Sequence, residues 1–139
     1  MDVLEIPFNK FLGLQKADTK NDFIFKLEHK KEYQNHLGTI HASALFALAE
    51  ASSGELLFNQ FKDCNLDVIP VVRKVEIKYS KPASGTVFSK VSIIDSNINE
   101  ILSELRSKKR IIIKVGVDIF NDKSEKLFTS FFDWFITLN

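Results

Sequence analysis

The sequence is poor in the residues that stabilise small proteins through covalent bonds or metal ions. Cysteine occurs once, as Cys64, so no disulfide can form within the chain. A single thiol also cannot supply the cysteine set of a structural zinc site. We therefore expect the fold to depend on side-chain packing, and we predict neither a bound metal nor a cofactor.

The sequence also lacks an excess of one charge and a long apolar run. Its 19 Lys and Arg residues are nearly balanced by 18 Asp and Glu residues, which argues against a nucleic-acid partner. Apolar stretches such as Ile111–Ile113 are far too short to span a bilayer, so no membrane partner is predicted. The acidic start Met1-Asp2 does not resemble a signal peptide, and we expect a cytoplasmic protein.

Phenylalanine, in contrast, is abundant, with 13 copies in 139 residues. Such aromatic area either fills a core or contacts a partner subunit. The length suits a single domain over residues 1–139, large enough to bury a real core. Several aromatic residues gather near the C-terminus, as Phe128, Phe131, Phe132, Trp134 and Phe135.

The spacing of apolar residues predicts an α+β fold with an antiparallel sheet. A long helix is predicted over residues 41–61, a proline-free run whose many small side chains allow a sheet to approach closely. Residues 97–107 fit either a short helix or a loop. The other predicted elements are a helix within residues 1–14, strands at 23–28, 71–79, 86–95, 111–119 and 127–138, and turns at 81–85 and 121–124.

The run from Asn35 to Glu50 places a polar loop directly before the long helix. The neighbours of Glu50, residues 44–49 and 51–54, are Ala, Leu, Phe, Ser and Gly. A carboxylate in such surroundings is costly unless it is paired or used, so Glu50 is predicted to be the working group. The alternative is a solvated residue on the exposed stripe of the helix.

The order of elements resembles the hotdog fold, in which a curved antiparallel sheet wraps a long central helix. Asn35, Gly38, His41 and Glu50 are similar in spacing to the motif of PaaI-like hotdog acyl-CoA thioesterases. In that motif a loop Asn or Gln precedes His-Gly-Gly, and an acidic residue follows nine positions after the His. The segment 81–85 is similar to a hairpin of the same family, and the resemblance extends over residues 23–138.

The resemblance implies an acyl-CoA or acyl-carrier thioesterase. The catalytic residues would be Asn35, His41 and Glu50, and the substrate-binding residues Gly38, Ala42, Ser43 and Ser53. The sequence departs from the family at two points. His-Gly-Gly is replaced by His41-Ala42-Ser43, and the Ser or Thr often found four residues after the acid is Gly54.

Thioester hydrolysis needs an activated water or a carboxylate nucleophile, and a donor for the oxyanion. Glu50 is the candidate base or nucleophile. The backbone N–H groups of Ala42 and Ser43, at the positive end of the helix, are the candidate donors. Asn35 either holds the water or is an ordinary turn residue, and His41 either binds the carbonyl or caps the helix.

The spacing of His41 and Glu50 also predicts an oligomer. Nine helical residues correspond to about 13.5 Å along the axis, too far for one carbonyl to touch both groups of the same chain. We therefore expect a homodimer with two composite sites, with a dimer of dimers as a further possibility.

Other functions were weighed against hydrolysis. A hotdog module that binds an acyl ligand without turnover is the main alternative, whereas a dehydratase would need a different spacing of His and acid. His36 and His41 match no zinc pattern. The basic segment 106–110 is either a solvated loop or a contact for coenzyme A phosphates.

Overall fold

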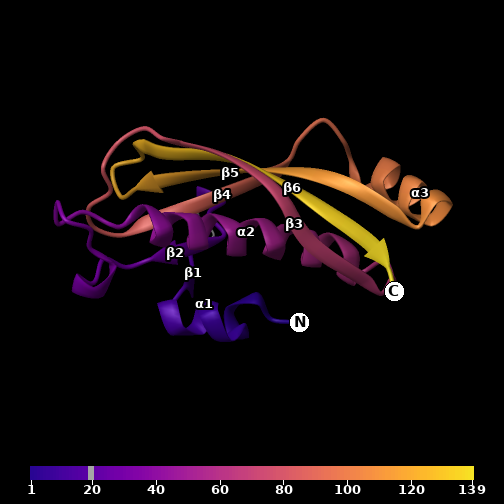
Figure 1. Ribbon diagram of the computed structural model, residues 1–139, viewed down its shortest axis with the longest axis horizontal. Helices are drawn as coiled ribbons and strands as arrows, with labels where there is room; N and C mark the ends of the chain where they lie inside the picture. Colours follow the sequence, from indigo (N-terminus) through magenta and orange to yellow (C-terminus); the bar gives the residue numbers. More distant parts are fainter. Residues whose placement is uncertain (19–20) are drawn as a thin grey trace.

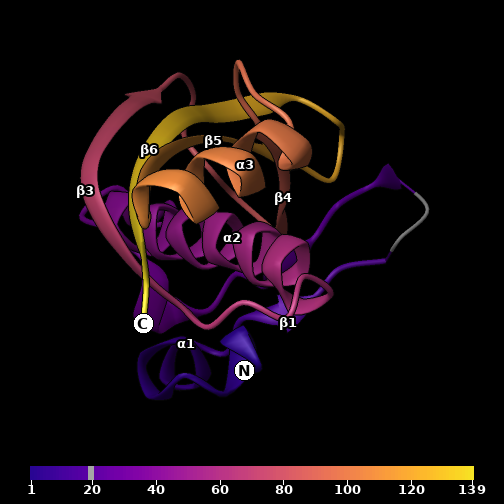
Figure 2. The same cartoon turned by 90° about the vertical axis from the view of Figure 1, so that its right-hand side faces the viewer.

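The computed structural model describes residues 1–18 and 21–139. Its strands form one antiparallel sheet in the order β1-β2-β4-β5-β6-β3, which curves around the long helix α2 (Figures 1 and 2). The strands are β1 (Gln15–Lys16), β2 (Phe25–Leu27), β3 (Val68–Tyr79), β4 (Val87–Ile93), β5 (Arg110–Asn121) and β6 (Lys126–Leu138). The helices are the 3-10 turns η1 (Val3–Glu5) and η3 (Lys31–Tyr33), together with α1 (Pro7–Leu12), α2 (Ala42–Lys62) and α3 (Ile98–Lys108). The sheet wrapped around a central helix is the predicted architecture.

The long helix α2 lies one residue further along the chain than predicted, at 42–62 instead of 41–61. Its alanines, serines and Gly54 are buried between residues 44 and 54, because small side chains let the sheet approach on several sides. At Gly54, an added Cβ would lie 3.7 Å from the ring of Trp134, which rests on the helix there.

Two predicted elements differ from the structure, and a third, left open between two alternatives, is decided by it. The N-terminal helix is divided at Ile6, whose ψ of 128° is extended, because the residue before a proline avoids helical angles and Pro7 then opens α1. The strand predicted at residues 23–28 is β2, which is only three residues long. It is preceded by β1, a two-residue strand too short to show any periodicity in the sequence. The ambiguous segment 97–107 is helical, as α3, with Asn97 as its N-cap.

The predicted hairpin at residues 81–85 is wrong. Among the described strands, β3 pairs only with β6, whereas β4 pairs with β2 and β5, so the two strands flanking this segment are not neighbours in the sheet. The segment is therefore a crossover and not the turn of a hairpin. Ile40 donates its backbone N–H to the carbonyl of Ala83 at 2.8 Å, so the crossover supports the start of α2.

The aromatic residues of β6 are divided between the two faces of the sheet. Phe128 and Phe132 are completely buried and Trp134 nearly so, on the face of the sheet that covers α2. Phe131 and Phe135 point to the opposite face, where Phe131 is 37% exposed. The core is closed by side chains of β5 and α3, including Ile101 and Leu105.

Candidate functional site

The N-terminus of α2 carries one free backbone donor. His41 is the N-cap, in an extended conformation with φ −61° and ψ 140°, and its Nδ1 accepts the N–H of Ser43 at 2.9 Å. The His41 N–H in turn donates to the carbonyl of Tyr33 at 2.6 Å. Within the described residues, the N–H of Ala42 has no partner. Of the two predicted oxyanion donors, only Ala42 is thus available without displacing the imidazole.

The loop before the helix is closed by Asn35. Its Oδ1 accepts the N–H groups of Leu37 at 2.9 Å and Thr39 at 3.1 Å, and its Nδ2 donates to the Thr39 hydroxyl at 2.9 Å. Gly38 has φ 76°, a left-handed angle that suits glycine, in open space at the tip of the loop. This geometry is that of the turn residue considered as the alternative for Asn35.

A cavity of about 290 Å³ lies between this loop, the start of α2 and the crossover. Asn35 and Ala42 line it, as do Leu37 and Pro82. Tyr79, at the end of β3, also lines the cavity, and its hydroxyl donates to the carbonyl of Ala42 at 3.3 Å. Burial raises the pKa of the Tyr79 phenol. The sequence reasoning missed Tyr79, and its position directly before the crossover was the one available signal.

Glu50 lies two turns further along α2 and outside this cavity. It is half-buried, and its carboxylate makes no hydrogen bond or ion pair with any described residue. Burial raises the pKa of this carboxyl above its usual 4.5, because the charged form loses hydration that no partner replaces. Eight residues of helix place Glu50 about 12 Å along the axis from Ala42. One chain therefore does not bring the predicted acid and the free N–H together.

Ser53 is held in the core. It is fully buried; its hydroxyl donates to the carbonyl of Glu50 at 2.7 Å and accepts the indole N–H of Trp134 at 2.9 Å. The predicted contact of Ser53 with substrate would break both bonds. The structure instead connects Ser53 to the backbone that carries Glu50. The exposed Ser43, by contrast, lies at the surface beside His41.

The basic segment 106–110 lies at the end of α3 and the start of β5, beyond the C-terminal end of α2 (Figure 1). The 21 residues of α2 extend about 30 Å, so these cations are remote from the Ala42 cavity of the same chain.

Residues 1–18 and 21–139 contain no group of three or more side chains that could hold a metal ion. In the same ranges, no helix has both the length and the hydropathy needed to cross a membrane.

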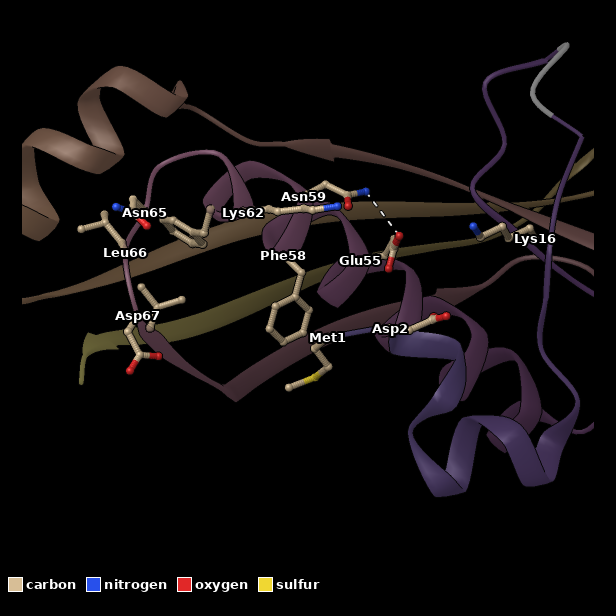
Figure 3. Close-up of a pocket in the computed structure, with 12 residues that line it drawn as sticks. Met1, Asp2, Lys16, Glu55, Phe58, Asn59, Lys62, Asn65, Leu66 and Asp67 are labelled. Atoms are coloured by element: carbon tan, nitrogen blue, oxygen red, sulfur yellow. Dashed lines mark hydrogen bonds between the residues drawn. The ribbon is translucent and has the colours of Figure 1, made fainter.

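A larger cavity, of about 730 Å³, lies near the other end of α2 (Figure 3). Phe58 points from α2 toward Met1, and Glu55 accepts a hydrogen bond from Asn59 at 3.3 Å. None of the residues predicted to act on substrate lines this cavity. Each of its three carboxylates, Asp2, Glu55 and Asp67, already accepts a hydrogen bond, so we regard the smaller cavity at Ala42 as the candidate site.

Comparisons with known proteins agree with this architecture. A family model described as a domain of unknown function (DUF4442) matches residues 15–136. No curated protein matches the chain.

Three solved structures are similar in fold, each at low sequence identity. The Pseudomonas aeruginosa protein PA5026, named a protein of unknown function and probable thioesterase, has 19% identity and a TM-score of 0.83, with 99% of this chain and 91% of that chain covered. The thioesterase HI1161 from Haemophilus influenzae has 15% identity and a TM-score of 0.75, covering 98% and 86%. BH2602 from Bacillus halodurans, solved with CoA, has 19% identity and a TM-score of 0.64, covering 81% and 69%. The fold is thus the hotdog fold of thioesterases, as the resemblance implied.

Proposed function

The chain belongs to the family described as a domain of unknown function (DUF4442), and from its site we propose that it hydrolyses an acyl thioester, most simply an acyl-CoA. The observation that carries the proposal is Glu50, a half-buried carboxylate without a partner in the described chain and with a raised pKa. Such a group is costly to the fold, and general base or nucleophilic chemistry gives a reason for it.

The reaction needs two groups on opposite sides of the thioester carbonyl. Glu50 either removes a proton from a water that attacks the carbonyl carbon or attacks that carbon itself. The carbonyl oxygen becomes an oxyanion, which accepts the free N–H of Ala42 at the positive end of α2. When the C–S bond breaks in the first route, the carboxylic acid forms and the thiolate takes up the proton that Glu50 removed from water. In the second route the attack of Glu50 expels the thiolate and forms an acyl-enzyme anhydride; water then hydrolyses the anhydride to the carboxylic acid and Glu50, and the thiolate takes up the proton released from that water. His41 positions this turn by capping it.

Because Ala42 and Glu50 lie about 12 Å apart along one helix, we propose that the two groups act from different subunits. Two antiparallel α2 helices, related by a two-fold axis near Phe46, would put Glu50 of one copy at the level of Ala42 of the other, because Phe46 lies midway between them. Phe46 is only partly covered and packs on Phe132 with ring centroids 5.8 Å apart. We therefore propose a homodimer with two composite sites.

The sheet offers an edge for this dimer. β3 is one of the two terminal strands, with β6 on one side and no described strand on the other, and such an edge is a template for pairing with another chain. Tyr79 contacts Ala42, so the end of β3 lies level with the start of α2. The proposed axis lies about 6 Å from Ala42 along the helix. Along β3 the same distance spans about two residues, counted from Tyr79. The two β3 strands would therefore cross near Ile77.

The similar structures support the choice of substrate. HI1161 carries the name thioesterase, and BH2602 was solved with CoA. Both have the fold described above at identities below 20%. They support a thioester with coenzyme A as the first substrate class to test.

A second function, acyl-ligand binding without turnover, is favoured by two hydrogen bonds. The N–H of Ser43 is occupied by His41, and the amide of Asn35 is occupied within its own loop. A site with a single free donor stabilises an oxyanion less than a site with two. Tight binding of acyl-CoA without release of thiol would establish this alternative.

Release of free thiol from a panel of acyl-CoA esters tests the proposal. We expect turnover by the wild-type protein and a loss of about 10²- to 10⁴-fold in kcat for Glu50→Gln, which keeps the shape of the side chain but cannot act as a base. Glu55→Gln, one turn further along the same helix, is the matched control and should retain activity. Equal turnover by Glu50→Gln and wild type would exclude the mechanism.

A further inference from the structure

The sheet has one face that no helix within residues 1–18 and 21–139 covers. α2 and α1 are stacked on the inner side of the sheet, and α3 lies beneath β5 and β6 beyond the end of α2 (Figures 1 and 2). Because side chains alternate along a strand, the residues between the buried positions point to the outer side. On β5 the buried positions Ile111, Ile113 and Val115 alternate with the exposed Ile112 and Lys114.

This outer face is strongly cationic. Its three carboxylates are each paired with a lysine of the same face, in the pairs Glu76–Lys74 at 3.2 Å, Asp118–Lys126 at 3.3 Å and Asp133–Lys114 at 3.9 Å. Four more cations, Arg73, Lys78, Lys90 and Arg110, form no ion pair with a described residue. On strands β3 to β6, seven cations against three carboxylates leave a charge of +4 on this face, whereas the whole chain carries +1. Lys26 of β2 points to the same side and is paired with Glu28 at 3.7 Å.

Aliphatic side chains interrupt these charges at one corner of the face. Ile112 on β5 is opposite Phe135 on β6, and Phe135 is opposite Val71 on β3. Ile112 is 57% exposed, Val71 51% and the nearby Ile69 48%. A hollow of about 480 Å³ at this corner is lined by Ile112 and Phe135, with Arg73, Arg110 and the Glu104–Lys108 ion pair around them. Arg73 lies over the Phe135 ring, 4.2 Å from its centroid.

We propose that this outer face binds an anionic membrane surface. The cations would meet lipid phosphates, and Ile69, Val71 and Ile112 would enter the boundary between headgroups and acyl chains. Peripheral binding of this kind needs no membrane-spanning segment. The sequence argument against a membrane partner considered only such segments, and so it did not test this kind of binding. The proposal does not depend on hydrolysis.

Two other occupants fit the face less well. A second copy of the chain packed on this face would bring two surfaces of charge +4 together, which is repulsive. Single-stranded nucleic acid would match the charge, but it binds through bases stacked on exposed aromatic rings. The most exposed apolar side chains here are aliphatic instead, and the rings of Phe88 and Phe120 each pack against Phe23.

Edge pairing of β3, as proposed for the dimer, would leave the outer face open and place two such faces side by side. Both could then contact one membrane, which strengthens binding without any new contact. Vesicle binding and hydrolysis are measured separately, so failure of one proposal leaves the other standing.

Co-sedimentation with vesicles tests the inference. We expect the wild-type protein to sediment with vesicles of equimolar phosphatidylcholine and phosphatidylglycerol, to remain in solution with phosphatidylcholine alone, and to be released by added salt. The double variant Lys78→Glu/Arg110→Glu should bind at least about tenfold more weakly. Ile112→Ser keeps the charge and should also weaken binding, which distinguishes insertion from attraction alone.

The matched control is Lys31→Glu/Lys62→Glu, which makes the same change of net charge away from the face and should bind like the wild type. Circular dichroism verifies the fold of each variant. The inference is wrong if the anionic vesicles leave the protein in solution, if the control loses as much binding as Lys78→Glu/Arg110→Glu, or if a single-stranded oligonucleotide binds in place of the vesicles. It is equally wrong if sedimentation shows a tetramer that the face variant dissociates, since the face would then hold another copy.

Discussion

The imidazole Nδ1 of His41 accepts a hydrogen bond from the backbone N–H of Ser43 at 2.9 Å. The ring therefore caps α2 and at the same time occupies one of the two backbone donors at its start. Because of this contact, the N–H of Ala42 is the candidate oxyanion donor, whereas the N–H of Ser43 is occupied. It also shows how a histidine can replace the Ser, Thr, Asn or Asp that usually caps a helix.

The cap predicts a difference between two substitutions at His41. His41→Ala removes the acceptor and should lower the free energy of unfolding by about 1 kcal/mol, whereas His41→Asn supplies a new acceptor and should restore most of it. Turnover should follow stability, because His41 positions the turn. Urea unfolding and thiol release measure the two effects. An Asn variant as stable as the wild type but inactive would mean that the ring itself contacts the substrate.

Ala42 allows the free N–H to be removed with little change in shape. Ala42 is the first residue of α2, where proline is favoured, and the ψ of 140° at His41 is compatible with a following proline. Ala42→Pro should therefore leave the melting temperature almost unchanged and lower kcat by about 10²- to 10³-fold, through loss of the oxyanion donor.

Ala42→Ser is the matched control for this experiment, because it keeps the N–H and adds only a hydroxyl. It should retain activity. An Ala42→Pro variant that folds and turns over at the wild-type rate would show that the oxyanion is stabilised elsewhere.

The raised pKa of Glu50 predicts a pH dependence for both activity and stability. The base must be ionised, so kcat/KM should rise with pH through a pKa above 4.5 and then level off, with no such step in Glu50→Gln. A carboxyl whose pKa is higher in the folded than in the unfolded state favours folding when protonated, and this contribution is lost as the pH rises through the folded pKa.

Glu50→Gln should therefore be more stable than the wild type at neutral pH, and the difference should disappear below pH 4.5. Chemical denaturation at several pH values measures this. A Gln variant less stable than the wild type at pH 7 would mean that the carboxylate has a favourable partner, for example across a dimer interface.

The proposed crossing of two β3 strands near Ile77 predicts which residues lie close to their own copies. In a Cys64→Ala background, Ile77→Cys should form a disulfide-linked dimer under mild oxidation, because its mate lies directly opposite. Val71→Cys, six residues from the crossing, would be separated from its mate by about 40 Å and should remain monomeric on a denaturing gel. Cross-linking through Val71→Cys but not Ile77→Cys would rule out this register.

The sequence by itself determined the elements whose signals are local. The alternation of Ile111, Ile113 and Val115 marked β5, and the small side chains before Gly54 marked a helix enclosed by a sheet, because burial on a defined face imposes a period. The unusual setting of Glu50 could be read from its neighbours for the same reason.

Only the tertiary structure decided how these elements meet. Pairing of β3 with β6 instead of β4 depends on contacts between strands far apart in the chain, which local periodicity does not encode. The same holds for Ser53, whose hydroxyl is bound by Trp134, 81 residues away. It also holds for the +4 outer face, since charges scattered along four strands become neighbours only when the sheet forms.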